Sequence, residues 1–260
     1  MKMRIHKLLA ERFARKLALR ASPVPVISFT FDDFPRSALT IGGRMLSDYG
    51  WRGTYYGAMG LMGTTVGAEP MFTRTDVDEL LTAGHELACH TLNHTSCYAV
   101  GNTNFVHGCE ENRREAAMAL GGYQLENLSF PHGHITLAAK RHLQAAYHTC
   151  RSIEMGINSD PADFGFLRAN AIYSRLPIET LKDLIHANTQ ANGWLIFYTH
   201  DVAIDPSQFG CTPDYFAEIL RAAHESGAEV LTIREATTRY NLCHSAASRA
   251  EEHRQECPRS

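Results

Sequence analysis

Short apolar segments alternate with helical segments along most of this chain, and no other feature restricts its fold as strongly. The segments predicted as strands span residues 24–31, 53–58, 86–89, 127–130, 148–152, 169–176, 194–198 and 229–233, and the predicted helices span residues 37–49, 75–83, 110–120, 136–146, 178–191 and 213–226. Repeated strand–helix alternation indicates a parallel sheet wrapped by helices, and seven or eight units favour a barrel. We therefore expect an α/β fold, a distorted (β/α) barrel of seven or eight parallel strands, irregular because residues 153–168 read as a long loop.

The chain divides into one large domain and two terminal segments. Its 260 residues contain no linker-like tract or internal repeat, so we assign one barrel domain to residues 23–240. Residues 1–22 place apolar side chains at helical spacing between basic ones, which predicts a basic amphipathic N-terminal helix. Such helices usually pack against their own domain; the alternative is peripheral contact with a membrane through residues 2–20. Residues 241–260 are predicted to be a flexible tail.

Composition excludes two classes of partner. A formal charge of −3 argues against a nucleic-acid surface, which needs an excess of basic residues. No apolar run approaches the length of a transmembrane segment. The N-terminal segment also lacks the uninterrupted apolar core of a signal peptide, which predicts a cytoplasmic protein, with a peripheral position on the inner membrane surface as the alternative.

Candidate chemical groups gather at the ends of the predicted strands. His90 and His94 are four residues apart just after a strand and form half of a metal site, for which a carboxylate from residues 29–33 is the expected third ligand. Taken alone, one such pair among fourteen histidines arises easily by chance. In parallel barrels, however, active sites lie at the carboxyl ends of the strands. The residues that fall there are Asp32, Asp33, His90, Pro131, His132, Gly133, Arg151 and His200.

Three of these segments resemble one known family. Residues 30–33 (TFDD), 90–94 (HTLNH) and 195–201 (LIFYTHD) are similar to motifs of the polysaccharide deacetylases of the NodB-homology type, carbohydrate esterase family four, and the similarity runs from about residue 24 to about residue 239. The resemblance implies a distorted barrel. It also implies metal-dependent removal of acetyl groups from sugars, usually from N-acetylglucosamine units.

The resemblance assigns roles position by position. It makes Asp33, His90 and His94 the ligands of Zn²⁺ or another divalent metal such as Co²⁺, Ni²⁺ or Mn²⁺. Asp32 becomes the general base and His200 the general acid. Pro131, His132 and Gly133 border the substrate, with the His132 backbone N–H facing the oxyanion.

The third family motif departs from its usual form. Ser129 stands where the family commonly has an arginine that orients the base, and His132 stands where it has a tyrosine. Our hypothesis is that Arg151, at the end of the next strand, reaches Asp32 instead. The partner that would orient His200 is not identified by spacing, and Glu154, Asp163 and Asp201 are the candidates.

The expected function is hydrolysis of N-acetyl groups on an amino-sugar oligosaccharide or polysaccharide, with an N-acetylated glycan as the partner. An intracellular oligosaccharide or a lipid-linked glycan precursor is the expected substrate. Two alternatives remain open. The same fold family includes enzymes that open cyclic ureides such as allantoin, and a non-catalytic glycan-binding relative would keep the fold without turnover.

Overall fold

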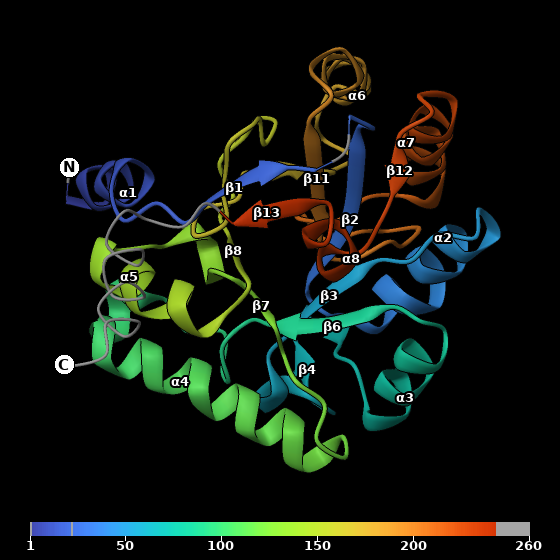
Figure 1. Ribbon diagram of the computed structural model, residues 1–260. Helices are drawn as coiled ribbons and strands as arrows, with labels where there is room; N and C mark the ends of the chain where they lie inside the picture. Colours follow the sequence, from blue (N-terminus) through green and yellow to red (C-terminus); the bar gives the residue numbers. More distant parts are fainter. Residues whose placement is uncertain (1, 22, 243–260) are drawn as a thin grey trace, which may run out of the picture.

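A parallel sheet of eight strands forms the centre of the protein (Figure 1). The computed structural model describes residues 2–21 and 23–242. The strands of this sheet are β2 (Val26–Asp33), β3 (Thr54–Gly57), β6 (Glu86–Cys89), β7 (Asn127–Ser129), β8 (Thr149–Arg151), β10 (Asn170–Ala171), β11 (Trp194–Thr199) and β12 (Glu229–Val230). Each overlaps a predicted strand, and every pairing is parallel. The predicted α/β fold with eight parallel strands is confirmed.

The sheet curls into an irregular barrel. The strand order is β10-β11-β2-β3-β6-β7-β8. Strand β12 lies outside this order and pairs with the first residues of β2, whereas β3 pairs with the last residues of β2. At the far edge, one isolated parallel bridge joins Arg151 to Leu167, in the segment that leads to β10. The predicted loop at residues 153–168 contains the short strand β9 (Ala162–Asp163), so here a bridge closes the sheet in place of a full strand pair.

Helices cover the outside of the sheet. They are α2 (Arg44–Asp48), α3 (Arg74–Thr82), α4 (Cys97–Ala119), α5 (Leu137–Ala146), α6 (Ile178–Ala191), α7 (Pro213–Glu225) and α8 (Ile233–Thr237), with a π-helical turn at Ala38–Gly43 and 3₁₀ turns at Met59–Leu61 and Pro131–Gly133. Helix α4 begins well before the predicted residue 110 and bends at Gly101, whose φ is +76°. The predicted strand 229–233 ends at Val230, because Thr232 and Glu235 form a capping box that starts α8.

Both terminal segments differ from the prediction. Helix α1 (Lys2–Arg12) covers only part of residues 1–22, and Leu17–Arg20 form a strand, β1. This strand pairs with β9 and with β13 (Tyr240–Leu242), long-range partners that helical periodicity could not reveal. Strand β13 also takes the first two residues of the predicted tail, and residues 243–260 lie outside the described residues.

Alternate residues of each strand face opposite sides of the sheet. Ile27, Phe29 and Phe31 of β2 pack in the core between sheet and helices. Val26 belongs to a second apolar cluster inside the barrel, as do Tyr56, Ala88 and Tyr198 from three other strands. Asp32 has the same parity as Val26 and therefore points into the barrel.

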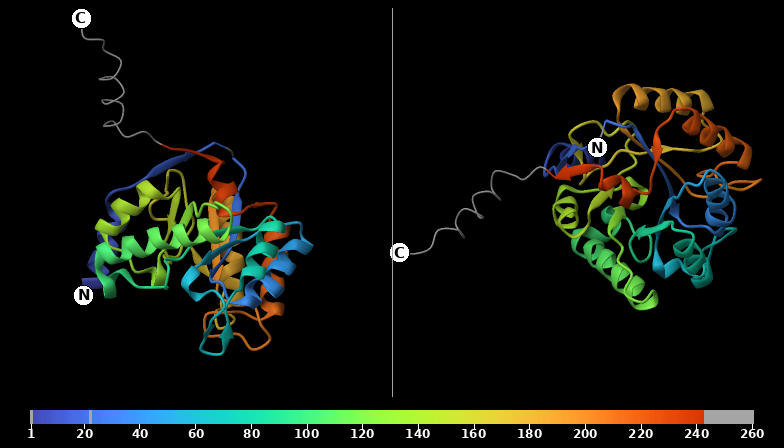
Figure 2. Two further views of the ribbon diagram at one scale, coloured as in Figure 1. Left: turned by 90° about the horizontal axis from the view of Figure 1, so that it is seen from below. Right: turned by 45° about the vertical axis from the view of Figure 1, so that its right-hand side comes forward.

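The two ends of the barrel differ (Figure 2, left). At one end, β1 and β13 lie across the sheet, and Tyr240 of β13 packs against Trp194, the first residue of β11. At the other end, the hairpin β4 (Thr65–Val66) and β5 (Glu69–Pro70) projects beside the loop that follows β11. This second end is formed at the carboxyl ends of the strands, where the predicted site residues lie.

Candidate active site

Three side chains from two strand ends meet at the mouth of the barrel. Asp33, the last residue of β2, places Oδ1 3.4 Å from Nε2 of His90 and 3.1 Å from Nε2 of His94. Both histidines follow β6, and donor atoms of all three residues lie within 4.8 Å of one another. The predicted metal-ligand set is therefore a compact cluster.

Unusual backbone conformations create this cluster. The pair His90 and His94 does not lie on a helical turn, as the spacing suggested, but in a bend in which Thr91 and His94 have φ of +61° and +51°. Asp33 has φ of +62°. Residues other than glycine rarely adopt this region, and such outliers concentrate at functional sites.

The donor set fits a bound cation. His90 Nδ1 lies 2.9 Å from the Ser129 carbonyl oxygen, so this nitrogen carries the proton and Nε2 presents its lone pair to Asp33. Burial lowers the pKa of His90 to about 3, which keeps the ring neutral. Asp33 Oδ1 is buried and has no hydrogen-bond donor within the described part of the chain. Lone pairs facing each other without a proton repel, whereas a divalent ion between them would satisfy all three atoms.

Asp32 makes a buried ion pair with Arg151. The guanidinium Nη2 of Arg151 donates to Asp32 Oδ1 and, at 2.6 Å, to Ser129 Oγ. The Arg151 side chain is fully buried between the rings of Tyr56 and Tyr198, at 4.9 and 5.0 Å from their centroids. Thus Arg151 reaches Asp32 from β8, and Ser129 accepts a hydrogen bond from it.

The two neighbouring aspartates have opposite pKa shifts. Burial raises the pKa of Asp33 to about 6; the His200 ring offsets part of this effect, and Asp32 adds to it. Burial also acts to raise the pKa of Asp32, but Arg151, helped by His90 and His200, outweighs it and lowers that pKa. Asp32 is consequently held as a carboxylate.

His200 lies on the other side of Asp33. Its Nδ1 is 3.3 Å from Asp33 Oδ2, and its ring packs against Phe209 at 5.2 Å between centroids. The three acids considered as its orienting partner bind elsewhere. Asp201 accepts hydrogen bonds from Ser207, Asp163 pairs with Lys140, and Glu154 pairs with Lys7.

A cavity of about 510 Å³ opens over these groups. Six predicted site residues line it: Asp32, Asp33, His90, His94, His132 and His200. The cavity wall also includes Tyr173, Tyr198 and Phe209, and Glu69 on the opposite hairpin, none of which was predicted from the sequence. Strand parity could have indicated Tyr198, which lies two residues before His200 and faces the same side of the sheet.

The segment from Pro131 to Gly133 forms one side of the mouth. His132 has φ of +58° and its ring contacts that of His94 at 4.5 Å between centroids. Pro131 is buried, and Gly133 has φ of +64° with Ile153 packed where a β-carbon would lie. Of the three residues predicted to touch substrate, only His132 lines the cavity.

Fold and site together define an α/β-barrel protein with a candidate metal centre at the carboxyl ends of its strands. The chain belongs to the polysaccharide deacetylase family, whose sequence profile matches residues 20–150. That match includes Asp32, Asp33, His90 and His94. Family membership makes the chain a hydrolase of the deacetylase and esterase type. None of the helices in residues 2–21 and 23–242 has the length and apolar character needed to cross a bilayer.

Solved structures share this fold. The Bc1960 peptidoglycan N-acetylglucosamine deacetylase matches with a TM-score of 0.59 at 14% identity, covering 88% of this chain and 95% of that one. A family 4 acetyl xylan esterase from Clostridium thermocellum, in complex with a cobalt ion, matches with a TM-score of 0.55 at 16% identity, covering 82% of this chain and 90% of that one. Bacillus subtilis PdaA, a family 4 carbohydrate esterase, matches with a TM-score of 0.55 at 12% identity, covering 89% of this chain and 88% of that one. A search of curated proteins found no match.

Proposed function

We propose that this chain is a metal-dependent hydrolase that removes N-acetyl groups from an amino-sugar oligosaccharide or polysaccharide. The observation that carries the proposal is the cluster of Asp33, His90 and His94, with Asp32 and His200 beside it in one cavity. The structures similar to this chain include an N-acetylglucosamine deacetylase and an acetyl xylan esterase. An amide substrate is proposed because the site offers His200 as an acid for an amine leaving group.

Asp33, His90 and His94 would hold the ion. A divalent ion such as Zn²⁺, Co²⁺, Ni²⁺ or Mn²⁺ bound there would polarise the acetamide carbonyl and make water more acidic. The hydrogen bond from His90 Nδ1–H to the Ser129 carbonyl fixes the ring so that Nε2 faces the site.

Asp32 is the proposed general base. Its pairing with Arg151 keeps the carboxylate ionised and fixes its direction, so that it accepts a proton from the attacking water. Arg151 acts through Asp32 and is a positioning residue, because it does not line the cavity.

His200 is the proposed general acid. An amide cannot release its nitrogen as a free anion, so a proton must reach that nitrogen as the bond to carbon breaks. The His200 ring lies at the cavity wall on the far side of Asp33 from the histidine pair. The backbone N–H of His132 would donate to the carbonyl oxygen as negative charge develops there.

An N-acetylated glycan is the proposed substrate. The cavity volume falls within the range of about 300–1,000 Å³ usual for small-molecule sites. Tyr173 and Phe209 contribute aromatic rings to the cavity wall, against which a sugar can pack. A cytoplasmic location, and with it an intracellular oligosaccharide or lipid-linked precursor, remains part of the proposal.

Acetate release tests the proposal. Purified protein without a polyhistidine tag should release acetate from N-acetylated chitooligosaccharides when Zn²⁺ or Co²⁺ is restored after chelation. Asp33→Ala is the matched inactive control. Hydrolysis of allantoin without acetate release would indicate the cyclic-ureide alternative. Glycan binding without either reaction, in protein that retains its metal, would indicate the non-catalytic one.

A further inference from the structure

Helix α1 turns its apolar side chains toward solvent. Ile5, Leu8, Leu9 and Phe13 are 49, 47, 37 and 53% exposed. Their spacing places them on one stripe of the helix. Phe13 directly follows α1 and continues its hydrogen-bond pattern, because its N–H donates to the Leu9 carbonyl. Helix α1 does pack against its own domain, as expected, with Ala10 buried in the core, but its apolar stripe is left exposed.

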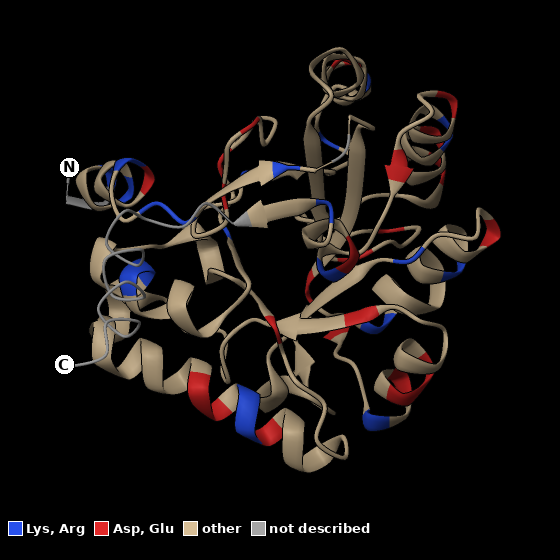
Figure 3. Cartoon of the chain, in the orientation of Figure 1, with Lys and Arg blue, Asp and Glu red and all other residues tan. Residues whose placement is uncertain are grey.

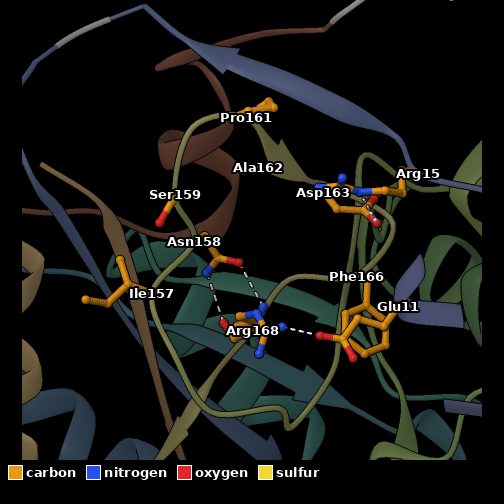
Figure 4. Close-up of a pocket in the computed structure, with 10 residues that line it drawn as sticks. All are labelled: Glu11, Arg15, Ile157, Asn158, Ser159, Pro161, Ala162, Asp163, Phe166 and Arg168. Atoms are coloured by element: carbon orange, nitrogen blue, oxygen red, sulfur yellow. Dashed lines mark hydrogen bonds and ion pairs between the residues drawn. The ribbon is translucent and has the colours of Figure 1, made fainter. Parts of the chain in front are cut away.

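Polar contacts hold the opposite face of α1 on the domain. Glu11 pairs with Arg168 (Figure 4), and Lys7 pairs with Glu154. The buried ammonium of Lys140 donates to the carbonyl oxygens of Ala10 and Phe13, at 2.7 and 3.2 Å. These contacts fix the rotation of the helix, because turning its apolar stripe inward would turn Lys7 and Glu11 toward solvent, away from Glu154 and Arg168.

Positive charge flanks the exposed stripe. Arg4 and Arg12 are exposed beside it, and Glu11 is the single acidic residue among the first twenty. Figure 3 shows both signs of charge on α1, and Glu11 accounts for the negative one. Its carboxylate is already paired with Arg168 on the domain side. The outward face therefore combines large apolar side chains with cations alone.

We propose that this face of α1, made of Arg4, Ile5, Leu8, Leu9, Arg12 and Phe13, docks on an anionic lipid surface. Apolar side chains enter the boundary between headgroups and acyl chains, while arginines pair with lipid phosphates. A stripe of exposed apolar side chains marks an interaction surface, because such side chains are usually buried. The docking does not depend on the proposed deacetylase activity.

Two other occupants fit the observations less well. Residues 243–260 contain no Leu, Ile, Val, Met, Phe, Tyr or Trp, so they have no large apolar side chain to place over the stripe. A second copy of the chain in a two-fold dimer through this face would place the arginines of one copy near those of the other, and like charges repel. An anionic surface is complementary to both features of the helix.

Three successive ring contacts connect α1 with the cavity wall. The ring of His6 in α1 packs 5.8 Å from that of Tyr98, which packs 4.6 Å from His134. His134 in turn contacts His132, at 5.3 Å between centroids, on the cavity wall. Docking through α1 would hold this side of the mouth near the headgroup layer.

Vesicle co-sedimentation of the full chain tests the proposal. The protein should sediment with vesicles of phosphatidylcholine mixed with phosphatidylglycerol, more weakly at high salt, and should stay in solution with phosphatidylcholine alone. Leu8→Ser/Phe13→Ser should reduce binding at least about tenfold, because both apolar anchors are lost. Arg4→Glu/Arg12→Glu should reduce binding to the anionic vesicles by a similar factor.

A matched control replaces exposed apolar residues that have no place in the stripe. Met118→Ser/Ile204→Ser removes side chains that are 65 and 90% exposed, and it should bind vesicles like the wild type. Circular dichroism and the melting midpoint must be unchanged in every variant. Failure of the wild type to sediment with anionic vesicles, equal binding to neutral ones, or a concentration-dependent dimer abolished by Leu8→Ser/Phe13→Ser would each overturn the proposal. So would binding that appears only after removal of residues 243–260.

Discussion

Replacing Arg151 with alanine should separate catalysis from metal binding. The guanidinium group is fully buried and bonds to Asp32, to Ser129 Oγ at 2.6 Å and to its neighbour's carbonyl, Ser152 O, at 3.1 Å. It touches none of the three proposed metal ligands. Its loss leaves the Asp32 carboxylate, 4% exposed, without its principal counter-charge.

The expected cost follows from that stranded charge. Breaking a buried ion pair by removing one partner typically destabilises a protein by about 3–5 kcal/mol. Part of this cost is avoided if Asp32 becomes protonated, because burial then raises its pKa without opposition from Arg151. A base that is misdirected and partly protonated should lower kcat by roughly 10²–10³-fold.

The pH–rate profile distinguishes this mechanism from simple unfolding. Since the pKa of Asp32 rises in Arg151→Ala, the acid limb of the profile should move to higher pH, and residual activity should recover as the pH is raised. Metal content, measured by mass spectrometry on protein without a histidine tag, should remain that of the wild type. The assay temperature must lie below the lowered melting midpoint.

Two further variants serve as controls. Arg151→Lys keeps one positive charge without the planar fork, and it should retain the position of the acid limb better than alanine while losing part of kcat. Ser129→Arg/Arg151→Ala returns the arginine to the strand where the family usually carries it, and should regain activity relative to Arg151→Ala. If folded Arg151→Ala turns over within about threefold of the wild type with an unshifted profile, the positioning role is wrong.

Three other outcomes are expected. His94→Ala should weaken metal binding by roughly 10²-fold or more at unchanged fold, because it removes one of three ligands; competition with a chelating dye measures this. His200→Gln should keep its metal but lose about 10²–10⁴-fold in kcat on an amide, and less on an aryl acetate whose leaving group needs no proton. Burial lowers the pKa of His85 to about 4, so the folded state resists protonation and stability should fall as the pH drops from about 6.5 towards 4, by up to roughly 3 kcal/mol. Urea unfolding at both pH values checks this.

Each of these has a control. Chelator-treated wild type sets the baseline for His94→Ala, and unchanged affinity would remove His94 from the ligand set. Equal losses on amide and aryl ester would contradict the acid role of His200. For His85, whose Nδ1 accepts the Gly53 N–H at 2.9 Å, glutamine keeps an acceptor and should flatten the acid slope. A slope that persists in His85→Gln would place its origin elsewhere.

Much of the fold was predictable because its signals are local. Apolar segments such as residues 194–198, and the helical patterns between such segments, can be recognised within a few neighbouring residues. All eight strands of the sheet were identified in this way. That His90 and His94 would meet a carboxylate from residues 29–33 was also predictable, since these residues lie at strand ends on one edge of a parallel sheet; the choice of Asp33 came from the family resemblance.

Boundaries depended on contacts that local patterns do not carry. The residues of β1 read as a continuation of the N-terminal helix, but their partners in β9 and β13 lie far along the chain. The bend that brings His90 and His94 together was read as a helical turn, because both arrangements bring residues four apart side by side.

The sequence by itself determined the parallel α/β architecture and the residue types at its mouth, because strand and helix periodicity arise within a few residues. Only the tertiary structure decided that Arg151 of β8 would pair with Asp32 of β2, since that contact depends on how far the sheet curls. It also decided which face of α1 is buried. The apolar stripe predicts burial, but ion pairs of Lys7 and Glu11 with the domain turn it toward solvent.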